Sequence, residues 1–260
     1  MTPRRSSFVI AAMIAVSAAC TQVGTDPAAV VALVFDALPF PAVVAGDTLR
    51  NEAGVVVPLV ATPVNSDGNT VEGAAVDFLA LDPGVSITDG GIIVSTNGSA
   101  TTTTTARLVA QVGTLQSRPL TLVITQSPDS AEQTGTVDTL RYSAVPNSVN
   151  ASSAITVHVL STAGDEPANV RGWLVKYTVT YNGTERPAND STLAWFIDPS
   201  NRRSAVDTTE ADGRASRRLR MLPTGLADDA DSLLVTATVT ARGSAVPGSP
   251  ITVVVHVRPQ

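Results

Sequence analysis

The chain has 260 residues and a formal net charge of −6, with 43% hydrophobic but only 4% aromatic residues. This length accommodates one large domain or two small ones. An acidic chain is poorly suited to nucleic acid, because phosphate binding needs an excess of clustered lysine and arginine, so we exclude that partner class. Abundant valine and threonine, with 18 glycines and 17 prolines as turn formers, favour an all-β fold with little helix.

The first segment, MTPRRSSFVIAAMIAVSAA, predicts a signal peptide over residues 1–19. Arg4 and Arg5 form a positive start, and an uncharged apolar run follows over residues 8–19. A run of this length suits the hydrophobic region of an export signal and is too short to cross a bilayer. Removal of the signal with its two arginines would change the net charge to −8.

The signal ends at Cys20, the only cysteine in the chain. Small residues followed by this cysteine resemble the lipobox of bacterial lipoproteins, and the resemblance implies cleavage before Cys20 and lipidation of its thiol. The sequence departs from the pattern at Ser17, where the family usually has an aliphatic residue. A plain secretory signal cleaved after Ala19, or an uncleaved anchor, remains an alternative. Thr21 favours the outer membrane, since the family's inner-membrane retention signal is aspartate.

A tether over residues 20–28 precedes the first predicted domain, residues 29–125. The stretch 105–112, TARLVAQV, alternates between two faces with the period of a half-buried strand. The stretch 55–64, VVVPLVATPV, is apolar on both faces, which is typical of a central strand or of a strand covered by a partner. Turn signals recur about every 10 residues, as in a β-sandwich.

The segment 126–136, QSPDSAEQTGT, has no large apolar side chain and predicts an inter-domain linker, with a long loop inside one domain as the alternative. A second predicted domain occupies residues 137–258. Its strand-like stretches are AITVHVL (154–160), GWLVKYTVTYNG (172–183), SLLVTATVTA (232–241) and PITVVVHV (250–257).

Two segments resemble known families. The stretch DTTEADGRASRRLRM (207–221) is similar to a hairpin in the bacterial Ig-like repeats of invasin and intimin type. The matching positions are Thr209, Asp212, Gly213 and Ala215 in the hairpin and 235–237 in the following strand. In the first half, Gly46 and Asp47 before VDFLALDPGVSI resemble the group 2 bacterial Ig-like domains. The resemblance implies two tandem immunoglobulin-like Greek-key β-sandwiches and leaves the ligand open.

Catalytic and metal-binding patterns are weak. His158 and His256 each fall in a predicted strand, opposite its aliphatic row, and Cys20 is assigned to lipid. No Gly-x-Ser-x-Gly motif occurs in the sequence. We therefore predict no enzyme activity, no metal site and no cofactor.

Two charged groups are candidates for binding. Asp228, Asp229 and Asp231 form an acidic loop that either binds calcium or is simply solvated. The basic group comprises Arg202, Arg203, Arg214, Arg217, Arg218 and Arg220. On a strand, Arg218 and Arg220 share one face and Arg217 points to the other. This group either meets anionic glycans or lipid head groups, or pairs with acidic side chains of the same surface.

The sequence thus predicts an exported, lipid-anchored envelope protein, with its domains in a structural or adhesive role towards an unknown protein or glycan. The alternative is a carbohydrate-binding or accessory subunit of a periplasmic envelope complex or transporter. An exposed aromatic platform would favour that alternative, and Trp173 and Trp195 are the only tryptophans available for it.

Overall fold

The structure is a computed structural model of the chain. It describes residues 29–98, 103–135, 139–143, 145, 148, 150–162, 166–188, 190, 192–222, 226 and 231–260. The predicted signal peptide, Cys20 and the tether to residue 28 lie outside the described residues. All regular secondary structure in the described part of the chain is β-strand, and the all-β prediction is confirmed.

The strands up to residue 125 form the first sandwich and pair only with one another in the described residues. One layer is the sheet β2-β9-β7-β4, with β8 added to β7, and the other layer consists of the two-stranded antiparallel sheets β1–β3 and β5–β6. Its strands are β1 (Ala32–Val34), β2 (Ala42–Val44), β3 (Thr62–Val64), β4 (Asp77–Ala80), β5 (Val85–Ile87), β6 (Ile93–Ser95), β7 (Thr104–Val112), β8 (Leu115–Gln116) and β9 (Leu120–Thr125).

The strands from residue 130 onward form the second sandwich. One layer is β10-β12-β18-β16, with β13 paired to β12, and the facing layer is β11-β22-β19-β14-β15, with β17 paired to β14. Its strands are β10 (Ser130–Thr134), β11 (Thr139–Tyr142), β12 (Ala151–Ser161), β13 (Ala168–Asn169), β14 (Leu174–Tyr181), β15 (Thr184–Arg186), β16 (Ala194–Ile197), β17 (Val206–Thr208), β18 (Arg214–Met221), β19 (Asp231–Thr238), β20 (Thr240–Ala241), β21 (Ser244–Ala245) and β22 (Ile251–Pro259).

Both sandwiches repeat one strand order. In the first, β2 lies parallel to the last strand β9, which is antiparallel to β7. In the second, β11 lies parallel to the last strand β22, which is antiparallel to β19. The two layers of the second sandwich follow the immunoglobulin arrangement, in which the first, second, fifth and fourth strands face a sheet built on the last strands. The chain is therefore two immunoglobulin-like sandwiches in series.

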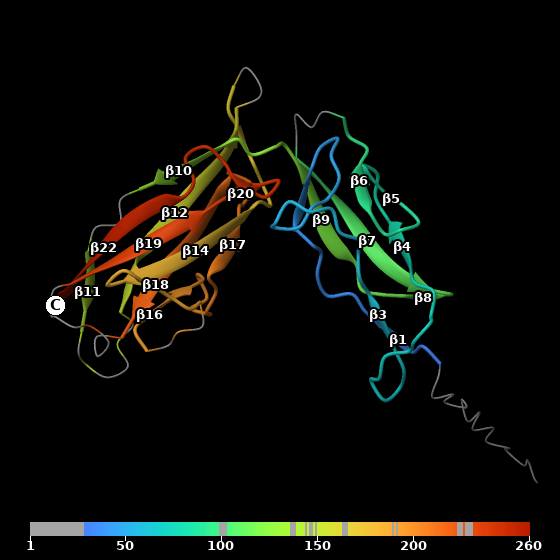
Figure 1. Cartoon of the computed structure of the whole chain (residues 1–260), viewed down its shortest axis with the longest axis horizontal. Helices are drawn as coiled ribbons and strands as arrows, with labels where there is room; N and C mark the ends of the chain where they lie inside the picture. Colours follow the sequence, from blue (N-terminus) through green and yellow to red (C-terminus); the bar gives the residue numbers. More distant parts are fainter. Residues whose placement is uncertain are drawn as a thin grey trace, which may run out of the picture.

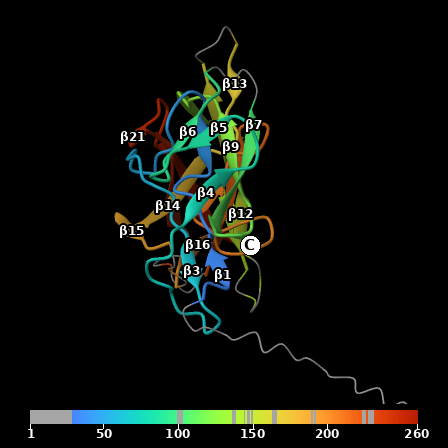
Figure 2. The ribbon, with the colours of Figure 1, turned by 90° about the vertical axis from the view of Figure 1, so that its right-hand side faces the viewer.

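Figure 1 shows the two sandwiches side by side and inclined towards each other, with the chain between β9 and β10 at the upper, narrow end. A turn of the first sandwich lies beside the β20 region of the second there. Figure 2 shows β5 and β6 of the first sandwich at this end, and β1 and β3 at the opposite end.

Alternation of side chains builds the cores, as the sequence predicts. Val175, Tyr177, Val179 and Tyr181 of β14 are buried, and so are the alternate residues of the paired strands β19 and β22. In β7, the alternate residues Ala106, Leu108 and Ala110 are fully buried. The long strands thus follow the period of two, because each covers a core with one face.

Two sequence predictions are wrong. Residues 130–134, predicted as part of a linker, form β10 and pair with β12. This strand is polar because it covers the core with little more than Ala131, which is 4% exposed. The stretch 55–64, predicted as a strand buried on both faces, contains only β3. Pro58 and Pro63 lack the N–H groups that a central ladder requires, and Leu59 donates its N–H to the Gly91 carbonyl instead.

Candidate functional site

The two sandwiches meet through a pair of tight turns. One turn contains Gly54 of the first sandwich, and the other joins β20 to β21 through Arg242 and Gly243. A Cβ atom on Gly54 would lie 2.2 Å from the backbone carbonyl carbon of Arg242, and one on Gly243 would lie 2.4 Å from the carbonyl oxygen of Ala53. Both glycines also have φ near +80°, at +77° and +80°, a region that L-residues with side chains rarely adopt. The turns pack backbone to backbone, which only glycine permits.

Charged and aromatic contacts surround these turns. Arg242 forms a salt bridge with Asp47, with 2.7 Å between Nη2 and Oδ2, and its Nε donates a hydrogen bond to the same oxygen. Burial acts to raise the pKa of Asp47, but hydrogen bonds from the Thr48 N–H and from Arg242 hold this pKa below its usual range. The rings of Phe40 and Trp173 pack with 4.9 Å between centroids at 59°. We call this set of contacts, with the two turns, the junction.

Trp173 is part of the junction and not of an exposed platform. Its side chain is 6% exposed, and its Nε1 donates a hydrogen bond to the carbonyl oxygen of Thr240. Next to it, Gly172 packs on Val123 so closely that a Cβ would lie 2.7 Å from a methyl group of that valine. No local sequence pattern reveals that the ring of Trp173 packs on Phe40 of the other sandwich.

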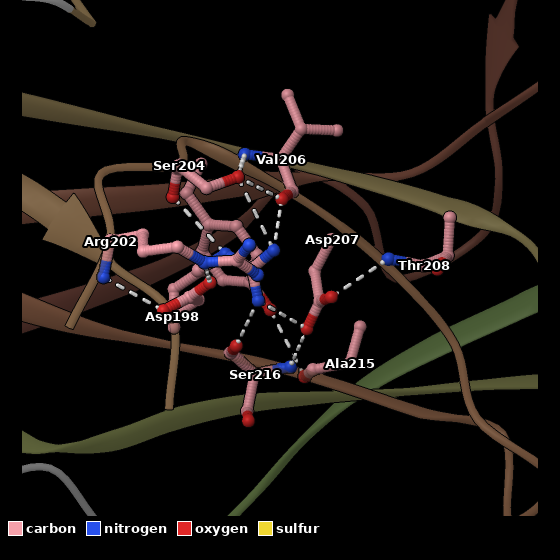
Figure 3. Close-up of polar contacts among 10 residues, drawn as sticks. Asp198, Arg202, Ser204, Val206, Asp207, Thr208, Ala215 and Ser216 are labelled. Atoms are coloured by element: carbon pink, nitrogen blue, oxygen red, sulfur yellow. Dashed lines mark hydrogen bonds and ion pairs between the residues drawn. The ribbon is translucent and has the colours of Figure 1, made fainter. Parts of the chain in front are cut away.

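A buried ion pair links the two sheets along one side of the second sandwich. Arg217 of β18 lies 2.7 Å from Asp207 of β17, which belongs to the facing sheet, and its side chain is only 8% exposed. The guanidinium also donates to the carbonyl oxygens of Ser204, Val206 and Ser216. Figure 3 shows these groups converging from different segments of the chain. With every donor direction occupied, the pair serves as a lateral clamp between the sheets and not as a site for a ligand.

A buried tyrosine next to this ion pair also links the two sheets of the second sandwich. The Tyr177 hydroxyl donates a hydrogen bond to the Ala215 carbonyl oxygen across the core at 3.0 Å. Burial raises the pKa of Tyr177, assisted by the negative charge of Asp207. The hydroxyl therefore stays protonated and acts as a structural donor.

The outer face of β16 and β18 carries the remaining arginines. Trp195 and Ile197 of β16 point away from the core, since the alternate residue Phe196 packs on Tyr177 inside it. In the β16–β18 register, Arg220 lies opposite Trp195 and Arg218 lies opposite Ile197. On the other edge of β16, Arg203 forms an isolated backbone β-bridge with Ile197. We call Arg203, Arg218 and Arg220, with Trp195, the arginine face.

The other members of the predicted basic group have different partners. Arg217 lies on the opposite face of β18 from Arg218 and Arg220, as the sequence pattern predicts, and the structure shows that its face is the inward one. Arg202 pairs with Asp198 at 2.8 Å, and Arg214 lies 3.6 Å from Asp212. The structure thus divides six arginines close in sequence into an internal clamp, two surface pairs and one face.

The histidines lie where the sequence predicts, on the outer faces of their strands. His158 contacts Glu132 at 3.1 Å and Asn169 at 2.8 Å, and His256 contacts Ser232 at 3.0 Å. No group of three or more His, Cys, Asp or Glu side chains that could hold a metal occurs among the described residues. In the acidic loop, Asp228 and Asp229 lie outside these residues. Asp231 accepts a hydrogen bond from the Tyr181 hydroxyl at 2.6 Å, so this carboxylate already supports the end of β19.

The contact between Asp47 and Arg242 joins residues 195 positions apart and was not predicted from the sequence. The only local signals were glycines at turns, Gly54 and Gly243, which indicate positive φ but not a partner. No helix long and apolar enough to span a membrane is found in the part of the chain that the structure covers.

No protein-family model matches the chain, and no characterised protein sequence matches it significantly. Among solved structures, it is similar to the Yersinia pseudotuberculosis adhesin InvE at 16% identity and a TM-score of 0.33, covering 84% of this chain and 56% of that one. It is also similar to the Escherichia coli adhesin FdeC at 14% identity and a TM-score of 0.31, covering 86% of this chain and 63% of that one. A human desmocollin-1 ectodomain matches at 12% identity and a TM-score of 0.30, covering 88% of this chain and 42% of that one. The chain thus spans about half of the length of these structures, and the likeness concerns the fold alone.

Proposed function

We propose that this chain is a non-enzymatic lipoprotein of the bacterial cell envelope, whose two immunoglobulin-like sandwiches form a stiff module with a structural or adhesive role. The observation that carries the proposal is the junction. Glycine turns in backbone contact, a salt bridge and an aromatic pair all act between the same two sandwiches. A module that holds a binding surface away from a membrane, or keeps neighbouring domains at a set distance, needs such a fixed connection between its sandwiches. Domains that act independently can be joined by a flexible linker instead.

The sequence before residue 29 supports the membrane attachment. A positive start, an apolar run and small residues ahead of Cys20 make up a lipoprotein signal, and the tether behind it would leave the sandwiches free of the bilayer. Acylation at more than one position gives stable anchoring, which a single acyl chain does not. Lipid attachment at Cys20 also accounts for one cysteine without a partner in an exported chain.

Membrane fractionation of cells expressing the full chain tests the anchor. We expect the parent chain in the membrane fraction and the Cys20→Ser variant in the soluble exported fraction. Ser17→Ala serves as the matched control, because it changes the segment before the cleavage site but retains the thiol. If Cys20→Ser stayed in the membrane fraction, lipid attachment at this residue would be refuted.

Protease treatment of intact and permeabilised cells then tests the adhesive role. Digestion of the sandwiches on intact cells is the result expected for an adhesive protein. Protection until permeabilisation would exclude contact with other cells and leave a structural role in the periplasm. An exposed aromatic platform would favour the alternative of a carbohydrate-binding or accessory subunit, and neither tryptophan provides one: Trp173 and Trp195 are both 6% exposed.

A further inference from the structure

The arginine face carries three positive charges that form no ion pair with the part of the chain that the structure describes. Among the described residues, Arg203, Arg218 and Arg220 have no carboxylate within salt-bridge distance, whereas their sequence neighbours Arg202, Arg214 and Arg217 each have one. In a chain with a net charge of −6, acidic side chains are plentiful enough to pair them. The absence of partners on this face therefore distinguishes it from the rest of the basic group.

One carboxylate, Asp190, lies near the edge of this face. It accepts hydrogen bonds from the N–H and the hydroxyl of Thr192 at 2.8 and 2.7 Å and lies 3.7 Å from Arg186. The Thr192 hydrogen bonds, with smaller contributions from Arg186 and Arg203, hold the pKa of Asp190 below its usual range. Asp190 is thus ionised but already engaged, and it balances at most one of the surrounding positive charges.

The arginines are held in place by the indole between them. The guanidinium carbon of Arg203 lies 4.5 Å from the centre of the Trp195 ring, and that of Arg220 lies 5.5 Å from it. Such cation–π contacts fix guanidinium groups while leaving their N–H edges available for acceptors. Arg218 is fixed by a hydrogen bond from its Nη2 to Asn201 at 3.0 Å, and its buried Nε has no hydrogen-bond partner.

From this arrangement we infer that the arginine face is a binding site for an acidic polysaccharide, in which the carboxylates of successive uronic acid residues accept hydrogen bonds from Arg203, Arg220 and Arg218. The inference rests on the proposed function, since it names the ligand class of the adhesive module. Planar guanidinium groups bind carboxylates through two parallel hydrogen bonds, and three of them along adjacent segments match a chain with regularly repeated charges.

The shape of the face favours a polysaccharide over a lipid bilayer. Arg218 and Arg220 are only partly exposed, and Trp195 and Ile197 between the arginines are buried. A flat membrane surface meets side chains that protrude, whereas a flexible chain can lie along β16 and reach arginines held close to the sheet. Stacking of a neutral sugar on Trp195 is excluded by the arginines that cover its ring.

Titration of the full chain, purified in a non-ionic detergent, with alginate oligosaccharides tests the inference. Calorimetry measures the affinity, and tryptophan fluorescence reports a change beside Trp195. Dextran oligosaccharides of the same size are the neutral control. We expect binding of alginate that weakens as salt is added, because charges on this surface are screened, and no binding of dextran.

Neighbouring arginines give a matched pair of variants. Arg203→Gln should weaken alginate binding about tenfold, the loss expected when a charge-assisted hydrogen bond is removed. Arg202→Gln removes the same charge from the adjacent position, but its side chain is 80% exposed and paired with Asp198, so we expect less than about a twofold effect. Arg203→Lys should recover only part of the affinity, because it keeps the charge but loses the planar contacts. Arg203 is exposed, so its replacement leaves the fold intact, which thermal unfolding checks.

Three results would overturn the inference: no binding of alginate by the parent chain, equal weakening by Arg202→Gln and Arg203→Gln, or binding of phosphatidylglycerol vesicles in place of alginate. The last would identify the face as a membrane contact. None of these results bears on the Cys20→Ser fractionation, so failure of the ligand assignment can be told apart from failure of the proposed envelope function.

Discussion

Replacement of Gly54 by alanine should open the junction. The new Cβ would lie 2.2 Å from the backbone of Arg242, and no side-chain rotation can relieve a contact between backbone groups. Restoring an ordinary carbon–carbon separation of about 3.5 Å requires the two turns to move apart by about 1 Å. That movement would separate the other junction contacts, since the same turns carry Arg242 and lie beside Trp173.

Gly68→Ala is the matched control for backbone strain. Gly68 has φ of +79°, close to the +77° of Gly54, but nothing lies within 4 Å of its added Cβ. The strain alone should lower the free energy of unfolding by about 1–2 kcal/mol at either glycine. The junction contributes about 0.5 kcal/mol from the exposed salt bridge and about 1 kcal/mol from the aromatic pair. We therefore expect Gly54→Ala to cost about 1.5 kcal/mol more than Gly68→Ala.

Distances between the sandwiches provide the direct measurement. In a chain carrying Cys20→Ser, spin labels at the exposed positions Ser86 and Glu185 report one sandwich each. Pulsed electron paramagnetic resonance should give a narrow distance distribution for this parent and for Gly68→Ala, and a broad one for Gly54→Ala. Equal distributions and equal free energies of unfolding for the two alanine variants would refute the idea that the turns fix the two sandwiches together.

Two further predictions concern ion pairs of different exposure. Asp207→Ala should lower the free energy of unfolding by about 3 kcal/mol, because it leaves Arg217 buried without its charged partner. Asp212→Ala, which removes a surface carboxylate, should change it by less than about 1 kcal/mol. Equal effects of the two variants in urea unfolding would contradict the role of the Arg217–Asp207 pair as a clamp. Hydrogen bonds from Arg107 lower the pKa of Asp82 from 3.8 to about 2 in the folded state. This stabilisation is present above pH 3.8 and is lost as the pH falls towards 2, so the difference in Tm between the parent and Asp82→Asn should disappear across that interval. A difference that persisted at pH 2 would argue against the ion pair as its source.

Strands that cover a core on one face could be predicted from the sequence. The alternation in β12, β14, β19 and β22 comes from burial of every second residue, and that pattern is local. Residues 130–134 lacked this signal because an edge strand that buries one alanine needs no apolar row. Residues 55–64 gave a false signal, because apolar composition predicts burial but says nothing of the N–H groups that proline removes.

The candidate site could be predicted only in part. Period two correctly separated Arg217 from Arg218 and Arg220, since neighbouring residues of a strand point to opposite faces. It could not tell which face is internal, nor that Trp195 would lie under two of the arginines. The contact between Asp47 and Arg242 depends on how two complete sandwiches meet, and no local pattern encodes that geometry.

The strand order shared by the two sandwiches has a mechanical consequence. In each, the strand near the beginning lies parallel to the last strand, as β2 does to β9 and β11 does to β22. A force that pulls the two ends of a sandwich apart slides such strands past each other along their length. The hydrogen bonds between them are then loaded in shear and must break together, whereas bonds at the end of a hairpin would peel open one after another. In a protein held at one end and pulled by flow or tension, these hydrogen bonds between parallel strands would carry the force in the direction in which they resist it most strongly.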